Sequence, residues 1–484
     1  MTSGTERAPC PLRAAATISP ERFAIIGGFG KITFRDLDRR VSAAEGSLVR
    51  SGIGAGDRVA IYLPKDERYI VLLLALIRSG AISCPISTRI PSAGATPLLQ
   101  KAACQTLISD DEEQFGATEA IRKVRPEALL EGDADHAEIR GRTEIPISRR
   151  ATIVFTSGSS GAPKAALHTF GNHYYSALGS NENIALDAKR GDRWLHSLPL
   201  YHVGGLSILF RCLLAGAAMV LPEPGLPLGR AISESGATHV SLVATQLMRL
   251  LKDESLPTLE TLKAVLLGGG PAPGALVEEA ASRGLPVHTS YGLTEMASQV
   301  TTTPHNVSPE KLRTSGRIIP YREVSISGDG EILVRGETLF VGYVEGETVS
   351  LPLDEEGWFH TGDLGDLDED GYLDVSGRKD NLFISGGENV QPEEIEEALR
   401  GLDGVEDAVV APVPDAEFGF RPAAFVRMVA GASPSDLAAT LESVLPRFKI
   451  PVSFHDWPED AGQAGIKVDR AFFRHRARDL ASGS

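Results

Sequence analysis

The stretch "RVAIYLPKDERYIVLLLALIRSGAISCPIS", residues 58–87, changes its hydrophobic pattern twice. It opens with the β-branched run "RVAIYL", continues with "DERYIVLLLALIRSG", which is apolar over the length of a helix and closes at Gly80, and ends with "AISCPIS". We interpret the three parts as a strand, a helix and a second strand. Two strands joined through a helix lie parallel in one sheet. The stretch therefore predicts an α/β fold with parallel strands.

The same alternation returns further along the chain. "SGATHVSLV" is followed by "TQLMRLLKD", and "LKAVLLGGG" by "PGALVEEAASRG" and "LPVHTSYG". In such folds ligands bind at the carboxyl ends of the strands. Three loops rich in glycine or hydroxyl groups follow expected strands, at residues 156–164, 266–273 and 288–295. We expect these loops to share one crevice.

The last third of the chain has a different pattern. After about residue 320 it reads as short strands and turns, and after Asp380 as a compact α+β segment in which Pro392 begins a helix whose first turn holds Glu393 and Glu394. We therefore predict an α/β protein: a large N-terminal domain of α/β layers plus a small β-barrel-like part over 1–379, followed by a small mobile α+β domain over 380–484.

The composition is that of a globular enzyme and argues against nucleic acid as a partner. The chain has 484 residues, 42% hydrophobic and 23% charged, which is longer than one core usually supports. Its 48 basic and 64 acidic residues give a formal net charge of −16, which would repel a phosphate backbone. We expect a metabolic enzyme with small-molecule substrates. The sequence leaves the oligomeric state open, a homo-oligomer included.

We expect a cytoplasmic protein that does not insert into a membrane. The N-terminus carries charges throughout and lacks the apolar run of a signal peptide. The longest apolar stretch, Tyr69 to Ile77, is far shorter than the roughly 20 residues that cross a bilayer. The cysteines lie far apart without metal-type spacing, which indicates reduced thiols without a catalytic role; they are Cys10, Cys84, Cys104 and Cys212.

The segment "TSGSSGAPK", residues 156–164, is a candidate phosphate loop. Glycine lets the backbone approach a ligand closely, and consecutive N–H groups in a tight turn form an anion site. The common phosphate loop needs Gly-Lys-Ser/Thr, whereas Ala162 and Pro163 separate Gly161 from Lys164. From its residues alone, the segment is either a different phosphate loop or a flexible linker.

Four segments in this order resemble the adenylate-forming superfamily: "TSGSSGAPK", "YGLTE" (291–295), "TGD" (361–363) with "GRKD" (377–380), and "GIK" (465–467). This superfamily includes acyl-CoA and aryl-CoA ligases, luciferases and the adenylation domains of peptide synthetases, and the resemblance covers nearly the whole chain. It implies that ATP, with Mg²⁺, converts a carboxylate to an acyl-adenylate with release of pyrophosphate. The thiol of CoA then displaces AMP.

The resemblance also implies roles for particular residues. Tyr291 would lie against adenine, although a tyrosine there can also be a core residue, Asp363 would bind the ribose hydroxyls, and Glu295 would hold magnesium. Thr156, Glu295 and Lys467 are the implied catalytic residues. The implied ATP-binding residues are Thr156, Ser157, Gly158, Ser159, Ser160, Gly161, Lys164, Gly269, Gly270, Tyr291, Gly292, Thr294, Asp363 and Arg378.

The C-terminal part would act in both steps. By resemblance, Lys467 enters the site and stabilises charge as the adenylate forms; without the resemblance it would be a solvated surface lysine. Asp380 falls at the position of the hinge, and Gly386 and Gly387 match the glycine loop that faces the site for CoA after the small domain rotates. A hinge needs few residues that absorb large backbone changes.

Further segments resemble the branch that ligates o-succinylbenzoate to CoA in menaquinone biosynthesis, among them "SLPLYHVGGLSILFRCLLAGA" and "DNLFISGGENVQPEEIE". His202 is the candidate partner for the carboxylate that is not activated, or else a helix cap, and Ser290 is a polar position near the substrate. Gly204 departs from the serine common there, which puts the carboxylate contact in doubt. The alternatives are another aryl- or acyl-CoA ligase, an adenylation domain that serves a carrier protein, and a sensor without turnover.

Overall fold

The computed structural model describes residues 6–482 except 112–114, 116–120, 132–142, 157–162, 254–258, 387, 416–417, 430–436, 443–444, 460 and 462–467. Within it, β4 (Arg58–Tyr62), α3 (Glu67–Ser79) and β5 (Ile82–Pro85) form the predicted unit, with β4 and β5 parallel. Gly80 ends α3 in the left-handed conformation at φ 93°, which glycine adopts without steric cost.

This unit lies in the middle of an eight-stranded sheet. The strand order is β21-β20-β10-β9-β5-β4-β6-β7. The strands from β5 to β7 are parallel to their neighbours, and β9 pairs parallel with β5, whereas β10, β20 and β21 add antiparallel pairs at one edge. The remaining strands are β6 (Thr106–Ser109), β7 (Arg122–Val124), β9 (Arg150–Thr156), β10 (Lys164–Thr169), β20 (Gly342–Glu345) and β21 (Thr348–Ser350).

A second sheet of nine strands has the order β17-β16-β15-β14-β13-β11-β12-β2-β3. Its six inner strands, from β15 to β2, run parallel, and antiparallel strands close both edges. The strands are β2 (Phe23–Gly27), β3 (Gly30–Thr33), β11 (Arg193–Leu195), β12 (Ala218–Val220), β13 (His239–Leu242), β14 (Ala264–Leu267), β15 (Val287–Leu293), β16 (Ser298–Thr302) and β17 (Arg317–Ile318). The predicted repeats of strand and helix are confirmed here.

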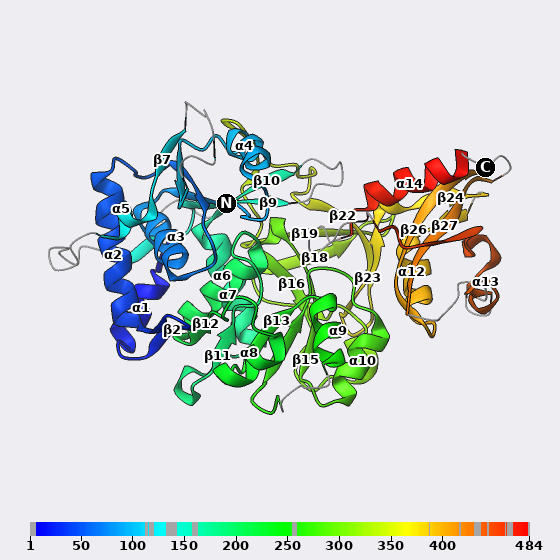
Figure 1. Cartoon of the computed structure of the whole chain (residues 1–484), viewed down its shortest axis with the longest axis horizontal. Coiled ribbons are helices and arrows are strands. Elements are labelled where there is room, and N and C mark those ends of the chain that lie inside the picture. Colours follow the sequence, from blue (N-terminus) through cyan, green and yellow to red (C-terminus); the bar gives the residue numbers. More distant parts are fainter. Residues whose placement is uncertain are drawn as a thin grey trace.

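One hydrophobic core joins the two sheets. It contains Ile61 of β4, Leu72 of α3, Phe170, Phe210 and Trp194 of β11. Helices α3, α6 and α7 therefore pack between layers (Figure 1). The helices of this part are α1 (Pro11–Ile18), α2 (Phe34–Arg50), α4 (Ser92–Lys101), α5 (Pro126–Leu130), α6 (Phe170–Asn183), α7 (Val203–Ala215), α8 (Leu228–Ser235), α9 (Ala244–Lys252), α10 (Gly274–Ser282) and α11 (Pro309–Leu312).

The predicted β-barrel-like part is a four-stranded antiparallel sheet, β18-β19-β22-β23. Its strands are β18 (Arg322–Ile326), β19 (Glu331–Gly336), β22 (Phe359–Leu367) and β23 (Leu373–Arg378). Not every strand after residue 320 belongs to this small sheet, because β20 and β21 join the eight-stranded sheet. The fold class is confirmed: mixed α/β layers with a small curled sheet, and then a small α+β part.

The α+β part forms the lobe that carries the C-terminus in Figure 1. Its helix α12 begins at Pro392, with Glu393 and Glu394 in the first turn, as predicted. The boundary at 379/380 and the mobility of this part stay predictions. The elements are β24 (Phe383–Ser385), β25 (Glu388–Val390), α12 (Pro392–Arg400), β26 (Val405–Asp415), β27 (Gly419–Met428), α13 (Leu437–Leu441), β28 (Ser453–Asp456) and α14 (Arg470–Ser482).

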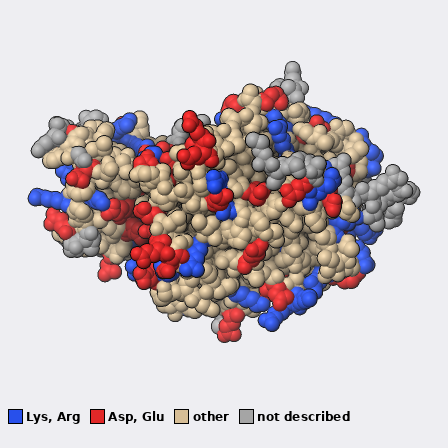
Figure 2. Space-filling view, turned by 180° about the vertical axis from the view of Figure 1, so that it is seen from behind, with Lys and Arg blue, Asp and Glu red and all other residues tan. Residues whose placement is uncertain are grey.

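The charged side chains are spread over the face of the molecule that Figure 2 shows, and the cysteines are unpaired, as expected from the sequence. Figure 2 shows acidic and basic side chains interspersed among uncharged ones on one face. Cys10, Cys84, Cys104 and Cys212 are buried free thiols. In the part of the chain that the structure describes, every helix is too short or too polar to cross a membrane.

Candidate active site

The loop "TSGSSGAPK" connects two antiparallel neighbours of the eight-stranded sheet. Thr156 ends β9, Lys164 begins β10, and the two residues are register partners. Five predicted ATP-binding residues of the loop lie outside the described residues: Ser157, Gly158, Ser159, Ser160 and Gly161. The hairpin fixes both ends of the loop at the edge of the sheet where β5 also ends.

Lys164 meets the "YGLTE" segment through a tyrosine. The Lys164 ammonium lies 4.9 Å from the centre of the Tyr343 ring, and the Tyr343 hydroxyl donates a 2.6 Å hydrogen bond to Oε1 of Glu295. Burial and the Glu295 carboxylate raise the pKa of Tyr343. The main chain adds two further links, from Phe340 N to the Glu295 carbonyl and between His168 Nε2 and the Thr294 carbonyl. The edge formed by β10 and β20 and the "YGLTE" segment of the other sheet thus lie in contact. That residues 156–164, 266–273 and 288–295 share one crevice stays a prediction.

Tyr343 is a site residue that the sequence motifs did not indicate. It lies on β20, and its partner in the ladder is Ala166 of β10. Gly342 before it has φ 143°, and a Cβ there would come within 2.5 Å of the Ser350 carbonyl oxygen, so this turn requires glycine. Gly342 was a signal in the sequence for this turn. The contact between Tyr343 and Glu295 had no local signal, because the two residues are 48 positions apart.

A second cluster joins Tyr291, Asp363 and Arg378. The Tyr291 hydroxyl donates to Asp363 Oδ2 at 2.6 Å, and Arg378 Nη1 donates to Asp363 Oδ1 at 2.8 Å. Asp363 and Arg378 are also register partners in β22 and β23. Burial, and after it the Asp363 charge, raises the pKa of Tyr291, so the phenol stays neutral and donates. Both carboxylate oxygens of Asp363 are therefore oriented by neighbours.

The glycine loop after β14 lies beside the start of this cluster. Gly269 has φ 85°, and a Cβ at Gly270 would meet no atom within 4 Å, so the backbone there is accessible. Ser290 donates its hydroxyl to the carbonyl of Leu267 at 2.9 Å. This bond gives Ser290 a structural role, joining β14 and β15. Its predicted contact with substrate is not tested.

Gly292 occupies a β-bulge of β15. A Cβ there would overlap the carbonyl oxygen of Ser298. A side chain at position 292 would push the two strands apart, and these strands position Tyr291 and Glu295. The glycine of "YGLTE" is therefore explained by the close approach of β16.

His202 stands at the first position before α7. Its side chain makes no capping bond to the helix, and its ring packs edge-on against Tyr201 with centroids 4.7 Å apart. His202 therefore occupies the N-cap position, where its carbonyl accepts from Leu206 N, without a side-chain capping bond. Its contact with substrate stays a prediction. A Cβ at Gly204 would reach 3.0 Å from a methyl group of Leu198, so the site has little room for the serine expected there.

Two buried arginines lie behind the Tyr291 strand and were missed by the sequence analysis. Arg211 of α7 donates to Oε1 of Gln299 at 2.5 Å, and Arg322 Nε donates to the Gln299 carbonyl at 2.7 Å. Burial lowers the pKa of each to about 9. Among the described residues, neither has a carboxylate within ion-pair distance. The segment "GGLSILFRCLL" that contains Arg211 has the apolar pattern of an ordinary core helix, so the sequence did not indicate a functional arginine there.

The predicted hinge lies between two anchored neighbours. Lys379 donates to Glu331 Oε2 at 2.9 Å on the large side, and Asn381 Nδ2 donates to Glu393 Oε1 at 2.5 Å on the small side. Arg474 of α14 donates to the Asp380 carbonyl at 2.9 Å. Asp380 lies between these anchors and is itself held on the large side, where Arg378 Nη2 donates to its Oδ2 at 3.2 Å. Gly386 has φ 59°, while Gly387 and Lys467 lie outside the described residues.

The residues around Glu295 fit a magnesium ion that a nucleotide shares. Magnesium is commonly bound by one or two carboxylates together with substrate phosphates. Among the described residues no group of three His, Cys, Asp or Glu side chains could hold a metal by itself. The Glu295 carboxylate, oriented by Tyr343, would supply the single protein ligand such a site needs.

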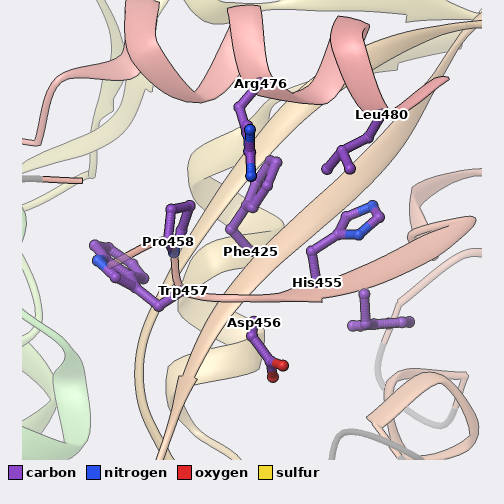
Figure 3. A pocket seen from close by; sticks show the side chains of 8 residues that line it. Phe425, His455, Asp456, Trp457, Pro458, Arg476 and Leu480 are labelled. Carbon is purple, nitrogen blue, oxygen red and sulfur yellow. The ribbon is translucent and has the colours of Figure 1, made fainter. Parts of the chain in front are cut away.

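A separate cavity of about 410 Å³ lies in the small lobe, between β28 and α14 (Figure 3). No predicted site residue lines it, and its walls come from Phe425, Phe454, His455, Asp456, Trp457, Pro458, Arg476 and Leu480. The cavity is therefore distinct from the clusters of Tyr291 and Glu295.

Comparisons with known proteins agree with this geometry. Residues 12–344 match the family described as AMP-binding enzyme, and residues 394–459 match the AMP-binding enzyme C-terminal domain. The 2-succinylbenzoate–CoA ligase of Geobacillus sp. (strain WCH70) is 34% identical, over 97% of this chain and 96% of the relative.

Solved structures of the o-succinylbenzoate CoA synthetase from Bacillus subtilis are also similar, at 31% identity. The complex with the acyl-adenylate intermediate OSB-AMP has a TM-score of 0.88, over 97% of this chain and 98% of that one. The complex with ATP and magnesium ion has a TM-score of 0.84, over 93% of this chain and 96% of that one. A double mutant bound with the product analogue OSB-NCoA has a TM-score of 0.71, over 96% of this chain and 98% of that one. The protein therefore belongs to the adenylate-forming AMP-binding enzymes, as an AMP-forming ligase of an acid and a thiol.

Proposed function

We propose that this ligase activates o-succinylbenzoate with ATP and transfers the acyl group to CoA, with release of pyrophosphate and AMP, in menaquinone biosynthesis. The observation that carries the proposal is the similarity, over 97% of the chain, to a ligase named for this substrate. Arg211 and Arg322, which donate to Gln299 on the strand next to that of Tyr291, are buried cations without a carboxylate partner among the described residues, and this acid brings a second carboxylate.

In the first half-reaction two anions must approach each other while pyrophosphate leaves. Donors and cations aimed at the phosphates beforehand lower this barrier. We assign this role to Thr156, residues 157–161 and Lys164. Tyr291 presents its ring to adenine, and Asp363, oriented by Arg378, accepts the ribose hydroxyls.

Glu295 is the proposed protein ligand for Mg²⁺, which would neutralise charge on the phosphates when bound. The Tyr343 hydroxyl donates to the Glu295 carboxylate and so fixes its orientation. The Lys164 cation lies over the Tyr343 ring, 4.9 Å from its centre. Tyr343 thereby links the phosphate loop and the metal ligand.

The spare carboxylate of the substrate needs a donor or a cation. His202 remains the proposed contact, since its ring is exposed and does not cap α7. Arg211, on the same helix, is the second candidate because its buried charge lacks an acidic partner among the described residues. An anion bound nearby would compensate that charge, and a neutral acid would not.

Lys467 is proposed to stabilise the first transition state and to leave the site for the second. The rotation needed for this exchange is placed at Asp380, with Gly386 and Gly387 facing CoA afterwards. The anchors on Lys379 and Asn381 support a hinge of one residue.

The test is pyrophosphate release with a panel of acids. The purified full chain is incubated with ATP, Mg²⁺ and either o-succinylbenzoate, benzoate, coumarate or a medium-chain fatty acid, and CoA thioesters are identified by mass. We expect kcat/KM to be highest for o-succinylbenzoate. A higher value for benzoate, coumarate or a fatty acid would assign the chain to another aryl- or acyl-CoA ligase.

A further inference from the structure

The small lobe contacts the large part through an ion pair far from the proposed site. Lys252 Nζ, at the last residue of α9, lies 3.1 Å from Oε1 of Glu406 on β26. The two residues are 154 positions apart and stand on opposite sides of Asp380. Their side chains are 60% and 33% exposed, so salt and substitution reach them without disturbing a core.

Arg283, which donates to the carbonyl of Leu251 next to Lys252, and Asp407, next to Glu406, each have an ion-pair partner of their own. Arg283 pairs with Glu279, and Asp407 pairs with Arg400 at 3.6 Å. In the described part of the chain, the pair's own members have no other ion-pair partner. The attraction between Lys252 and Glu406 therefore acts between the two lobes and not within one.

A second contact crosses the hinge closer to the site. Gln391, just before α12, donates Nε2 to the carbonyl of Arg378 at 3.1 Å. Gly377 makes this approach possible: its φ is 147°, and a Cβ there would come within 2.5 Å of the Gln391 nitrogen. This contact joins the two parts next to Asp380, and the Lys252–Glu406 pair joins them at a second place.

The described arrangement superposes differently on two complexes of one Bacillus subtilis enzyme. The TM-score is 0.88 for the complex with the acyl-adenylate and 0.71 for the double mutant with the CoA product analogue. The whole chain, with Lys252 paired to Glu406, is thus more similar to the acyl-adenylate complex than to the double mutant.

We infer that the Lys252–Glu406 pair is a positioning device that holds the small lobe in the arrangement for adenylation and so sets the balance between the two half-reactions. The inference rests on the proposed function for the identity of these steps. A rotation about Asp380 would separate the pair, because one member turns with the small lobe. An exposed pair shifts such an equilibrium by about two- to fivefold.

Charge reversal tests the inference. Adenylation is measured as pyrophosphate release without CoA, and the second step as thioester formation from supplied acyl-adenylate, for Lys252→Glu, Glu406→Lys and the double reversal. We expect each single variant to lower the ratio of the first rate to the second by about two- to fivefold. The double reversal restores the ratio, and added salt removes the difference.

Matched controls change the same charge within one helix. Arg230 and Glu234 of α8 form an exposed pair on the large part, with side chains 59% and 51% exposed. Arg230→Glu and Glu234→Lys should leave the ratio unchanged. The inference would be overturned if the single reversals of Lys252 and Glu406 left the rate ratio unchanged, as the controls do. It would also be overturned if the double reversal lowered the ratio by the combined effect of the two single reversals.

A distance measurement separates this inference from the substrate assignment. Spin labels on Lys189→Cys and Glu397→Cys lie on exposed residues of the two lobes, and the native cysteines are buried. We expect the Lys252→Glu chain to show a broader interlobe distance distribution than the parent, and the double reversal to restore it. Unchanged distributions would refute the pair's role whichever acid is the substrate.

Discussion

The hydroxyl of Tyr291 donates a 2.6 Å hydrogen bond to Oδ2 of Asp363, 72 residues further along the chain. The bond joins the strand that carries "YGLTE" to the curled sheet that carries "TGD". Because Arg378 binds the other oxygen of Asp363, the carboxylate has one orientation. Two motifs predicted to bind one nucleotide are therefore linked by a direct side-chain contact.

Tyr343→Phe should impair the use of magnesium. The variant keeps the ring beneath Lys164 but removes the donor that orients Glu295, a bond to a charged group that is worth about 1.5–3 kcal/mol. The Mg²⁺ concentration for half-maximal adenylation should rise about tenfold or more. Titration of pyrophosphate release with Mg²⁺ measures it, with Tyr174→Phe as control. An unchanged titration would contradict the role given to Tyr343.

Lys467→Ala should abolish adenylation and spare CoA transfer from supplied acyl-adenylate. Its proposed charge acts only while the adenylate forms, so the two half-reactions separate. The measurements are pyrophosphate release and thioester formation on the same preparation. Pyrophosphate formation at the parent rate would show that another residue supplies the charge.

Asp380→Pro should have the opposite effect. Proline fixes φ near −65°, so the hinge can no longer absorb the rotation. Acyl-adenylate should accumulate while CoA product does not form. Far-ultraviolet circular dichroism verifies the fold of the variant; equal loss of both half-reactions in a folded chain would argue against a hinge at this residue.

His202→Ala should weaken o-succinylbenzoate binding by about 1.5–3 kcal/mol, the range for a lost hydrogen bond to a charged group. ATP affinity should hardly change. An analogue without the ring carboxylate should bind both proteins alike, and the four measurements give one coupling energy. The same four measurements with Arg211→Gln show whether Arg211, instead of His202, contacts the ring carboxylate. A coupling near zero at both positions would favour a different aryl-CoA ligase.

The free energy of unfolding should fall steeply in mild acid. Burial lowers the pKa of His168, His239 and His288 to about 4, whereas in the unfolded chain each titrates near 6.5. Between these values the unfolded chain binds more protons, so stability is present above pH 6.5 and is lost as the pH falls toward 4. Each histidine contributes on the order of 3 kcal/mol at most.

Denaturant unfolding at pH 7.5, 6.0 and 5.0 measures this loss. His288→Asn, which keeps a donor for the Thr303 carbonyl, should show a shallower dependence than the parent. An exposed histidine substitution, His475→Asn, serves as control because its side chain is 81% exposed. A parent whose stability does not change over this range would contradict the buried neutral state.

The layers of the fold and the family can be predicted from short stretches of the sequence. The change of hydrophobic period in residues 58–87 specifies β4, α3 and β5, because side chains repeat every two residues in a strand and every 3.6 in a helix. Gly80 and Pro392 marked helix ends for local steric reasons. Four short motifs were sufficient for the adenylate-forming family. All of these signals lie within a few consecutive residues.

The contacts between residues far apart in the sequence could not be predicted in this way. Tyr343 reaches Glu295 because β20 leaves the curled sheet and pairs with β10. Arg211 lacks an acidic partner among the described residues because the layers that bury it bring none, and Lys252 meets Glu406 because the small lobe turns toward α9. Local periodicity contains no information on these contacts. They follow from the packing of whole layers, whose free energy is a sum over the entire chain.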